Sequence, residues 1–173
     1  AILLIYYSKY YFLSTKYGAP GLAGAVVTTL MPVLVYLLMM FSKQKKTQGK
    51  DWLALLLGVL GVLVTMNIWQ FQLSEIISGT SVYLLAAATC WALMSIVTTY
   101  AKSVVPATLS FYIYLMTAIF DLIFFFEPTH GSILAMDSVF WINFLIVTIG
   151  STTFATTVYF LGIQKLGSKQ ASV

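Results

Sequence analysis

Long apolar runs alternate with short polar breaks along the chain. A helix needs about 20 predominantly apolar residues to cross roughly 30 Å of hydrocarbon. Runs of this kind, of which the first is shorter than the rest, occupy Ala1–Leu13, Gly21–Phe41, Trp52–Ile68, Thr80–Ala101, Ala107–Phe126 and Ser138–Ile163. Gly, Pro and Ser fill the breaks between them, which is typical of turns. The pattern therefore predicts about six membrane-spanning helices joined by short loops.

Composition supports a membrane protein. Hydrophobic residues make up 60% of the 173 residues and charged residues only 8%, against about 25% charged residues in a typical soluble protein. So few charges cannot cover a surface exposed to water, whereas a surface exposed to lipid needs almost none. The predicted fold class is an all-α integral membrane protein, a polytopic helical bundle. Its single cysteine, Cys90, lies inside an apolar run, so we expect neither a disulfide nor a metal site, and no cofactor.

The charged residues fall unevenly on the two sides of the predicted bundle. One side carries seven lysines and one acid, namely Lys43, Lys45, Lys46, Lys50, Asp51, Lys102, Lys165 and Lys169. The other side carries Lys16, Glu75, Glu127, His130 and Asp137. Because short Lys-rich loops stay on the cytoplasmic side, loops 42–51, 102–106 and 164–170 are predicted to be cytoplasmic. The expected location is the inner (plasma) membrane, with the lipid bilayer as partner; scattered lysines do not favour a nucleic-acid partner.

Two stretches of the chain have similar sequences, and we call this similarity the sequence echo. "YFLSTKYG" (Tyr11–Gly18) ends the first predicted helix and "YFLGIQKLG" (Tyr159–Gly167) ends the last. The two helices are five crossings apart. Since five is odd, a duplicated five-helix unit would insert in opposite orientations, which predicts an inverted-topology repeat like those of many secondary transporters.

Four stretches resemble the drug/metabolite transporter superfamily, specifically its EamA-like members. They are "YFLSTKYGAPGLAGAVVTTLMPVLVYLL", "DWLALLLGVLGVLV", "YLLAAATCWALMSIVTTYAK" and "TTVYFLGIQKLGSKQAS". The resemblance implies ten helices in two inverted repeats, of which this chain would hold about the third to the eighth, incomplete at both ends. It also implies that the first and last helices of this chain face a shared central cavity. Residues 1–70 would then be the last part of the first repeat and residues 71–173 the first part of the second. A Glu that the family often has after its Pro-bearing helix is missing from the stretch between Phe41 and Lys46.

The function that this resemblance implies is secondary transport of small metabolites, amino-acid-like or drug-like, by alternating access. No phosphate-binding Gly-Lys-Ser/Thr loop occurs in the chain, so ATP is not the expected direct drive. Proton or sodium coupling stays open, and so does a homodimer. The protein is not expected to be an enzyme. The alternatives are a non-transporting scaffold or accessory subunit of a larger membrane complex, and a membrane-embedded enzyme.

Ionisable side chains within the predicted spans are the first candidates for the substrate pathway. Lys9 lies seven residues before Lys16, and a lysine at membrane depth is costly unless it faces water or a partner. Asp121 lies in the fifth run, where an intramembrane carboxylate can carry a proton. The alternatives are that Lys9 extends along its own stem to the interface and that Asp121 stays hydrated near the headgroups.

The remaining candidates are aromatic residues, threonines and one proline. Tyr6 and Tyr10 share a helix face near Lys9, Tyr112 lies in the fifth run, and Trp91 belongs to a stretch that carries the family resemblance. Pathway lining and simple packing both explain them. The spacing of Thr148, Thr152 and Thr156 predicts one polar stripe on the last helix, which suits either a pathway or helix–helix contacts. Pro32, in the middle of its helix, would kink it and could form a gate.

Overall fold

Every regular element in the described part of the chain is a helix. The computed structural model describes residues 1–18, 20–41, 49–65, 79–101, 103–125 and 135–172. Its helices are α1 (Ile2–Tyr17), α2 (Pro20–Phe41), α3 (Gly49–Thr65), α5 (Gly79–Thr98), α6 (Pro106–Phe124), α7 (Ser138–Leu145), the π-helix η3 (Ile146–Ala155), α8 (Thr156–Leu166) and α9 (Ser168–Ala171). A helix therefore lies at each of the six predicted runs.

Much of the predicted charge pattern falls outside these residues. Lys43, Lys45, Lys46, Glu75, Lys102, Glu127 and His130 are not among the residues that the structure describes. Of the loops predicted to be cytoplasmic, only 164–170 is described in full. The assignment of the two membrane sides from lysine counts therefore stays a prediction.

Three elements form one continuous rod. α7, η3 and α8 follow one another without a break from Ser138 to Leu166, a span of 29 residues. This rod, Thr80–Thr98 and Pro106–Phe124 are the helices in the described residues that are long and apolar enough to cross a membrane, and Val26–Met40 is a shorter apolar helix. Helix α1 has 16 residues and α3 has 17. The structure therefore supports at least three of the six predicted spans by length and composition.

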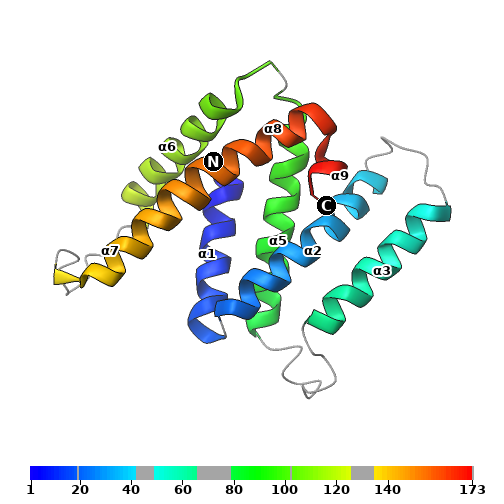
Figure 1. Ribbon diagram of the computed structural model, residues 1–173, viewed down its shortest axis with the longest axis horizontal. Coiled ribbons are helices and arrows are strands. Elements are labelled where there is room, and N and C mark those ends of the chain that lie inside the picture. The colour runs from blue at the N-terminus through cyan, green and yellow to red at the C-terminus, as the bar shows by residue number, and fades with distance from the viewer. Residues whose placement is uncertain (19, 42–48, 66–78, 102, 126–134, 173) are drawn as a thin grey trace.

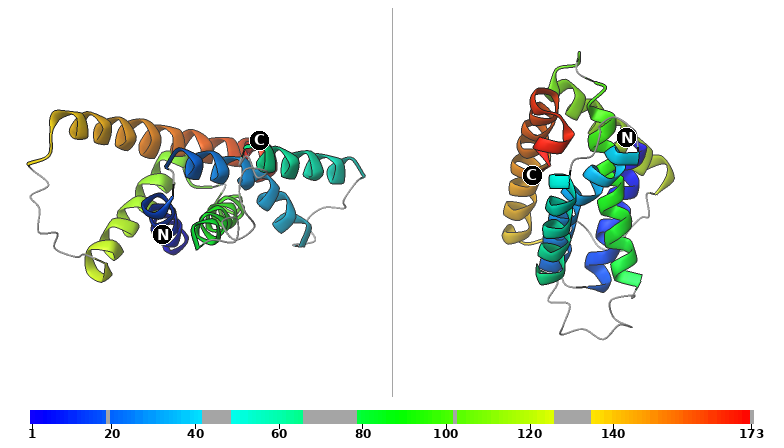
Figure 2. Two further views of the ribbon diagram at one scale, coloured as in Figure 1. Left: turned by 90° about the horizontal axis from the view of Figure 1, so that it is seen from below. Right: turned by 90° about the vertical axis from the view of Figure 1, so that its right-hand side faces the viewer.

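The helices pack in two layers. α1, α5 and α6 lie on one side and the rod and α3 on the other, with α2 in contact with both α5 and α3 (Figures 1 and 2). The first core cluster fills the junction of α2 and α5 with the buried residues Ala23, Val26, Val27, Leu84, Ala87 and Ala88. The second joins α1, α5 and α8 through Leu4, Met94, Phe160 and Ile163. Small residues in the first cluster let the backbones approach closely, as in membrane bundles.

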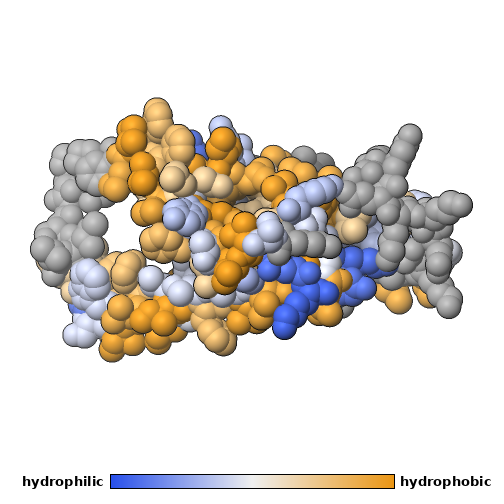
Figure 3. Space-filling model, turned by 90° about the horizontal axis from the view of Figure 1, so that it is seen from above, coloured by the Kyte–Doolittle hydropathy of each residue, from blue (hydrophilic) through white to orange (hydrophobic). Residues whose placement is uncertain are grey.

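The distribution of polar and apolar side chains is the one expected for a protein in lipid, with hydroxyl groups among the buried residues and large apolar side chains on the surface. Buried positions include the hydroxyl residues Ser14, Ser95, Thr98, Ser110, Thr117, Thr156, Ser168 and Ser172. Large apolar side chains are exposed instead, for example Phe154 at 69%, Ile123 at 67% and Leu57 at 62%. Apolar side chains also cover much of the described surface in Figure 3. In water this arrangement would leave a large apolar surface uncovered, whereas in a bilayer it costs little.

Gly58 permits close packing of α3 on α2. A Cβ added at Gly58 would lie 2.9 Å from Cγ2 of Val33, which is buried and whose β-branched side chain has little rotamer freedom. We therefore expect Gly58→Ala to lower the free energy of unfolding by about 1–3 kcal/mol. Thermal unfolding in detergent micelles measures this change.

Gly61 on the same helix supplies the matched control. Nothing lies within 4 Å of a Cβ added there, so Gly61→Ala should be neutral, or should stabilise the helix by up to about 1 kcal/mol. Equal unfolding temperatures for the two variants would contradict the close approach of α3 to α2.

Candidate functional site

One face of α1 directs tyrosines toward α5. Leu4, Tyr7, Tyr11 and Ser14 follow one another at intervals of three and four residues, so they lie on one side of the helix. Leu4 and Ser14 are buried, and Tyr7 and Tyr11 stack with ring centroids 5.8 Å apart. The Tyr7 ring also lies 4.7 Å from that of Trp91 on α5. This is therefore the face of α1 that packs into the interior of the bundle.

The aromatic contacts continue from α5 to α8. The rings of Trp91 and Tyr159 are 6.0 Å apart, so Tyr11, Tyr7, Trp91 and Tyr159 form an unbroken series of ring contacts across three helices. The Tyr159 hydroxyl lies 2.8 Å from Oγ of Ser95 and donates to Sδ of Met31 on α2 at 3.7 Å. Tyr159 therefore connects α8 with both α5 and α2.

Hydroxyl pairs also join α6 to the rod. The Tyr114 hydroxyl lies 3.0 Å from Oγ1 of Thr156, and Oγ1 of Thr157 donates to Oγ of Ser110 at 3.2 Å. Tyr114 and Ser110 share a face of α6 with Thr117. We call Tyr7, Trp91, Ser95, Tyr114, Thr156 and Tyr159 the aromatic–hydroxyl cluster.

The cluster is uncharged, and its hydroxyl protons have alternative acceptors. The Ser95 hydroxyl also approaches the Trp91 carbonyl at 2.8 Å. Ser95 and Tyr159 each carry one hydroxyl proton, which can be donated to the Trp91 carbonyl, to the other hydroxyl or to Met31 Sδ. All buried side-chain nitrogen and oxygen atoms in the described residues have a partner. The Ser95 and Tyr159 hydroxyls can therefore turn from their present acceptors toward a bound polar molecule, and no buried charge results.

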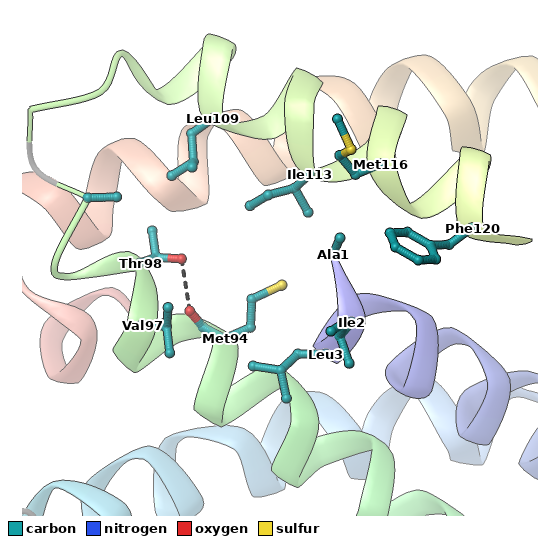
Figure 4. A pocket seen from close by; sticks show the side chains of 11 residues that line it. Ala1, Ile2, Leu3, Met94, Val97, Thr98, Leu109, Ile113, Met116 and Phe120 are labelled. Carbon is teal, nitrogen blue, oxygen red and sulfur yellow. Dashed lines mark hydrogen bonds between the residues drawn. The ribbon is translucent and has the colours of Figure 1, made fainter.

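An apolar cavity of about 590 Å³, open to the outer surface, lies beside the cluster, between the start of α1, the C-terminal half of α5, and α6. Figure 4 shows Met94 and Thr98 on one wall and Ile113, Met116 and Phe120 opposite. The Thr98 hydroxyl donates to the Met94 carbonyl at 2.8 Å. Leu3, Met94, Leu109 and Ile113 belong both to this lining and to the second core cluster or its edge, so they separate the cavity from the hydroxyl groups.

This cavity differs from the expected one. The inverted repeat predicts a cavity shared by the first and last helices, but the residues lining this one come from α1, α5 and α6, and from Ala101 just after α5. α1 and α8 instead contribute to one packed core, since Leu4 and Phe160 both belong to the second core cluster. None of the ten residues predicted from the sequence lines the cavity.

Two of those ten residues belong to the cluster, and the other three aromatic candidates and Pro32 do not. Trp91 and Thr156 are cluster members, and Thr156 is buried. Tyr10 packs against the first core cluster and stacks on Tyr83 at 6.2 Å. Tyr6 stacks on Tyr10 but is 47% exposed, and Tyr112 is 54% exposed. Pro32 lies inside α2 and is half-buried.

Lys9 and Asp121 lie apart from the cluster. The Lys9 ammonium sits 4.8 Å from the centroid of the Phe125 ring, just past the end of α6, and its side chain is exposed. A cation is favoured both by the ring face and by the C-terminal end of a helix. Asp121 is half-buried on the same face of α6 as Tyr114 and Thr117. The observed contact of Lys9 is therefore one that anchors α1 to α6.

The three threonines of the rod do not form the predicted stripe. Thr148 is exposed, Thr152 half-buried and Thr156 buried. Their exposure follows the packing of the rod, because neither α7 nor η3 has a buried residue whereas α8 does. The prediction also assumed α-helical winding throughout, which was wrong for residues 146–155, a π-helix.

The sequence reasoning did not select four members of the cluster: Tyr7, Ser95, Tyr114 and Tyr159. A usable signal existed for Tyr7, because Leu4, Tyr7, Tyr11 and Ser14 keep the three-and-four spacing of a packed helix face. The spacing of Ser110, Tyr114 and Thr117 is similar. Ser95 and Tyr159 are 64 positions apart and meet only through the packing of α5 on α8, for which no local signal exists.

Comparison with known proteins gives no family for this chain: no family model, no curated protein and no solved structure matches it. The described residues also contain no group of three or more His, Cys, Asp or Glu side chains that could hold a metal ion. The site is therefore interpreted from its own geometry.

Proposed function

We propose that the protein is a multi-pass transporter that moves a small amphipathic metabolite across the plasma membrane by alternating access. The observation that carries this proposal is the aromatic–hydroxyl cluster at the centre of a bundle whose outer surface is apolar. Hydroxyl groups at membrane depth are costly unless they find partners inside the protein. Their concentration where α1, α5, α6 and α8 meet supports a polar route through the bundle.

The directions of the helices support the proposed alternation. In Figure 1, α1, α2, α3, α5, α6 and the rod run alternately down and up the view. The C-terminal ends of α2, α5 and α8 lie toward the same side, as the lysine pattern requires. α1 and the rod run in opposite senses, which favours the proposed inverted repeat of the EamA-like kind.

The site suggests what kind of molecule would be carried. The hydroxyls of Ser95, Tyr114 and Tyr159 suit a polar or zwitterionic group, since they can both donate and accept. The neighbouring cavity, lined by side chains such as Leu109 and Ile113, suits an apolar group. An amphipathic metabolite such as an apolar amino acid combines both, although Leu3, Met94, Leu109 and Ile113 must move for one molecule to reach both regions.

Transport measurements test the proposal. The protein, in its full reading frame, would be reconstituted into vesicles of phosphatidylethanolamine and phosphatidylglycerol and supplied with labelled apolar amino acids. Uptake or exchange should exceed that of protein-free vesicles and should be measured with and without proton and sodium gradients. A folded, correctly inserted protein that moves none of them under any gradient would favour the scaffold alternative.

The two ends of the rod should lie on opposite membrane faces. Met136 precedes the rod and is 48% exposed, and Gln170 follows it and is exposed. In a Cys90→Ala background, we expect an impermeant maleimide added outside intact cells to label Met136→Cys. Gln170→Cys should react only after permeabilisation, because the lysine pattern predicts that its loop is cytoplasmic.

Labelling of both positions from the same side would contradict the spanning rod. Labelling from opposite sides but in the reverse sense would preserve the rod and overturn only the orientation derived from the lysines.

A further inference from the structure

We infer that η3 is a register switch: residues 146–155 can rewind from π-helix to α-helix and thereby turn α7 about the rod axis relative to α8. The π-helix is rare and is usually a single turn within an α-helix, but here it covers ten residues in the middle of a rod. At its C-terminal end the Thr156 N–H donates to the carbonyl of Ser151, five residues earlier, and also to that of Thr153, three residues earlier.

The two ends of the rod are held very differently. α8 buries Thr156, Phe160 and Ile163, and it is tied to its neighbours by the hydroxyl contacts of the cluster. Its Gln164 side chain also donates to the carbonyls of Ala101 and Val104, at 3.1 and 2.8 Å. By contrast, neither α7 nor η3 has a buried residue. A change of winding in η3 would therefore turn α7 while α8 stays in place.

Threonine hydroxyls within the segment can support both windings. Elsewhere in the described residues threonine hydroxyls bond the carbonyl three or four residues earlier, as Thr99 does with Ile96 at 2.6 Å and Thr98 with Met94 at 2.8 Å. In the rod they reach back five residues, from Thr153 to Thr148 at 3.0 Å and from Thr156 to Ser151 at 3.3 Å. After rewinding, the same hydroxyls meet the carbonyl four residues earlier, so neither winding leaves them without an acceptor.

Rewinding would turn the part of the rod that precedes Thr156. Thr156 is held at the Tyr114 hydroxyl, 3.0 Å away. An α-helix turns by about 100° per residue and the wider π-helix by less, so a change of winding over the ten residues of η3 would rotate α7 through a large angle about the rod axis. The switch concerns the winding of the rod itself, and it stands whether or not the protein is a transporter.

Distances between spin labels test the switch. Labels at Ile142→Cys and Val158→Cys would bracket η3 at exposed positions, in a Cys90→Ala background of the full protein in phosphatidylcholine vesicles. Labels at Val82→Cys and Val97→Cys, both exposed on the α-helix α5, form the control pair. Pulsed electron paramagnetic resonance should give two distances for the rod pair and one for the control pair.

Gly150→Ala is the control within η3. Nothing lies within 4 Å of a Cβ added at Gly150, and both windings hold the backbone in a helical conformation, so alanine should leave both rod distances in place. The control pair should not change. A single distance for the rod pair would overturn the switch.

Discussion

Phe160→Ala should lower the free energy of unfolding by about 3 kcal/mol, measured by reversible unfolding in detergent or bicelles. Phe160 is completely buried and packs in the second core cluster with Leu4, Met94 and Ile163, so its truncation leaves a cavity between α1, α5 and α8. We expect the lower end of the usual range for buried phenylalanine, because lipid replaces water as the alternative surroundings and only the packing is lost.

Phe12→Ala is the matched control for this prediction. Phe12 occupies the corresponding place in the sequence echo, in Tyr-Phe-Leu at 11–13 against 159–161, but it is 67% exposed. Its truncation should change the free energy of unfolding by no more than about 0.5 kcal/mol. Equal losses of stability for Phe12→Ala and Phe160→Ala would mean that the two residues have similar surroundings, which would contradict the packing of α8 described above.

The helical segments could be predicted because each is a long apolar run that ends at turn residues. Gly18 and Gly167 end α1 and α8 where the sequence echo places them, and Gly167 has a positive φ of 90°, which other residues rarely adopt. The winding of 146–155 could not be predicted in this way. Apolar and β-branched residues with hydroxyls are compatible with either winding, and the choice depends on the whole rod.

The candidate site was predicted in part, for a related reason. Trp91 and Thr156 were selected, whereas Tyr6 and Tyr112 were preferred to Tyr7 and Tyr114, although the members of each pair are only one or two positions apart. One position turns a side chain by about 100° around an α-helix. The inward member can be chosen only when the position of the neighbouring helix is known. The usual rule that the most apolar face points inward does not help, because the interior holds hydroxyl groups beside its apolar core and the lipid-facing surface is apolar too.

Tyr159→Phe should reduce the transport rate by about twofold to thirteenfold while the bundle stays folded. The change removes only the hydroxyl that contacts Ser95 at 2.8 Å and Met31 at 3.7 Å. Ser95 keeps the Trp91 carbonyl as an acceptor, whereas the indole N–H of Trp91, which also bonds the Tyr159 hydroxyl, loses this partner. A net loss of one hydrogen bond is worth about 0.5–1.5 kcal/mol, and the same loss in the transport barrier gives the stated range of rates. The measurement is initial uptake or exchange of labelled apolar amino acids into proteoliposomes.

Tyr112→Phe makes the same chemical change on the outer surface of the bundle. Tyr112 is 54% exposed and stands edge-on to Phe111, with ring centroids 5.6 Å apart, so its loss of hydroxyl should leave the rate unchanged. A fall in rate for Tyr159→Phe alone would locate the pathway in the aromatic–hydroxyl cluster. An equal fall for both variants would point to a general effect on folding, and a fall for Tyr112→Phe alone would move the pathway to the face that the sequence first suggested. Because the two substitutions share their chemistry, the difference in rate between them reports position alone.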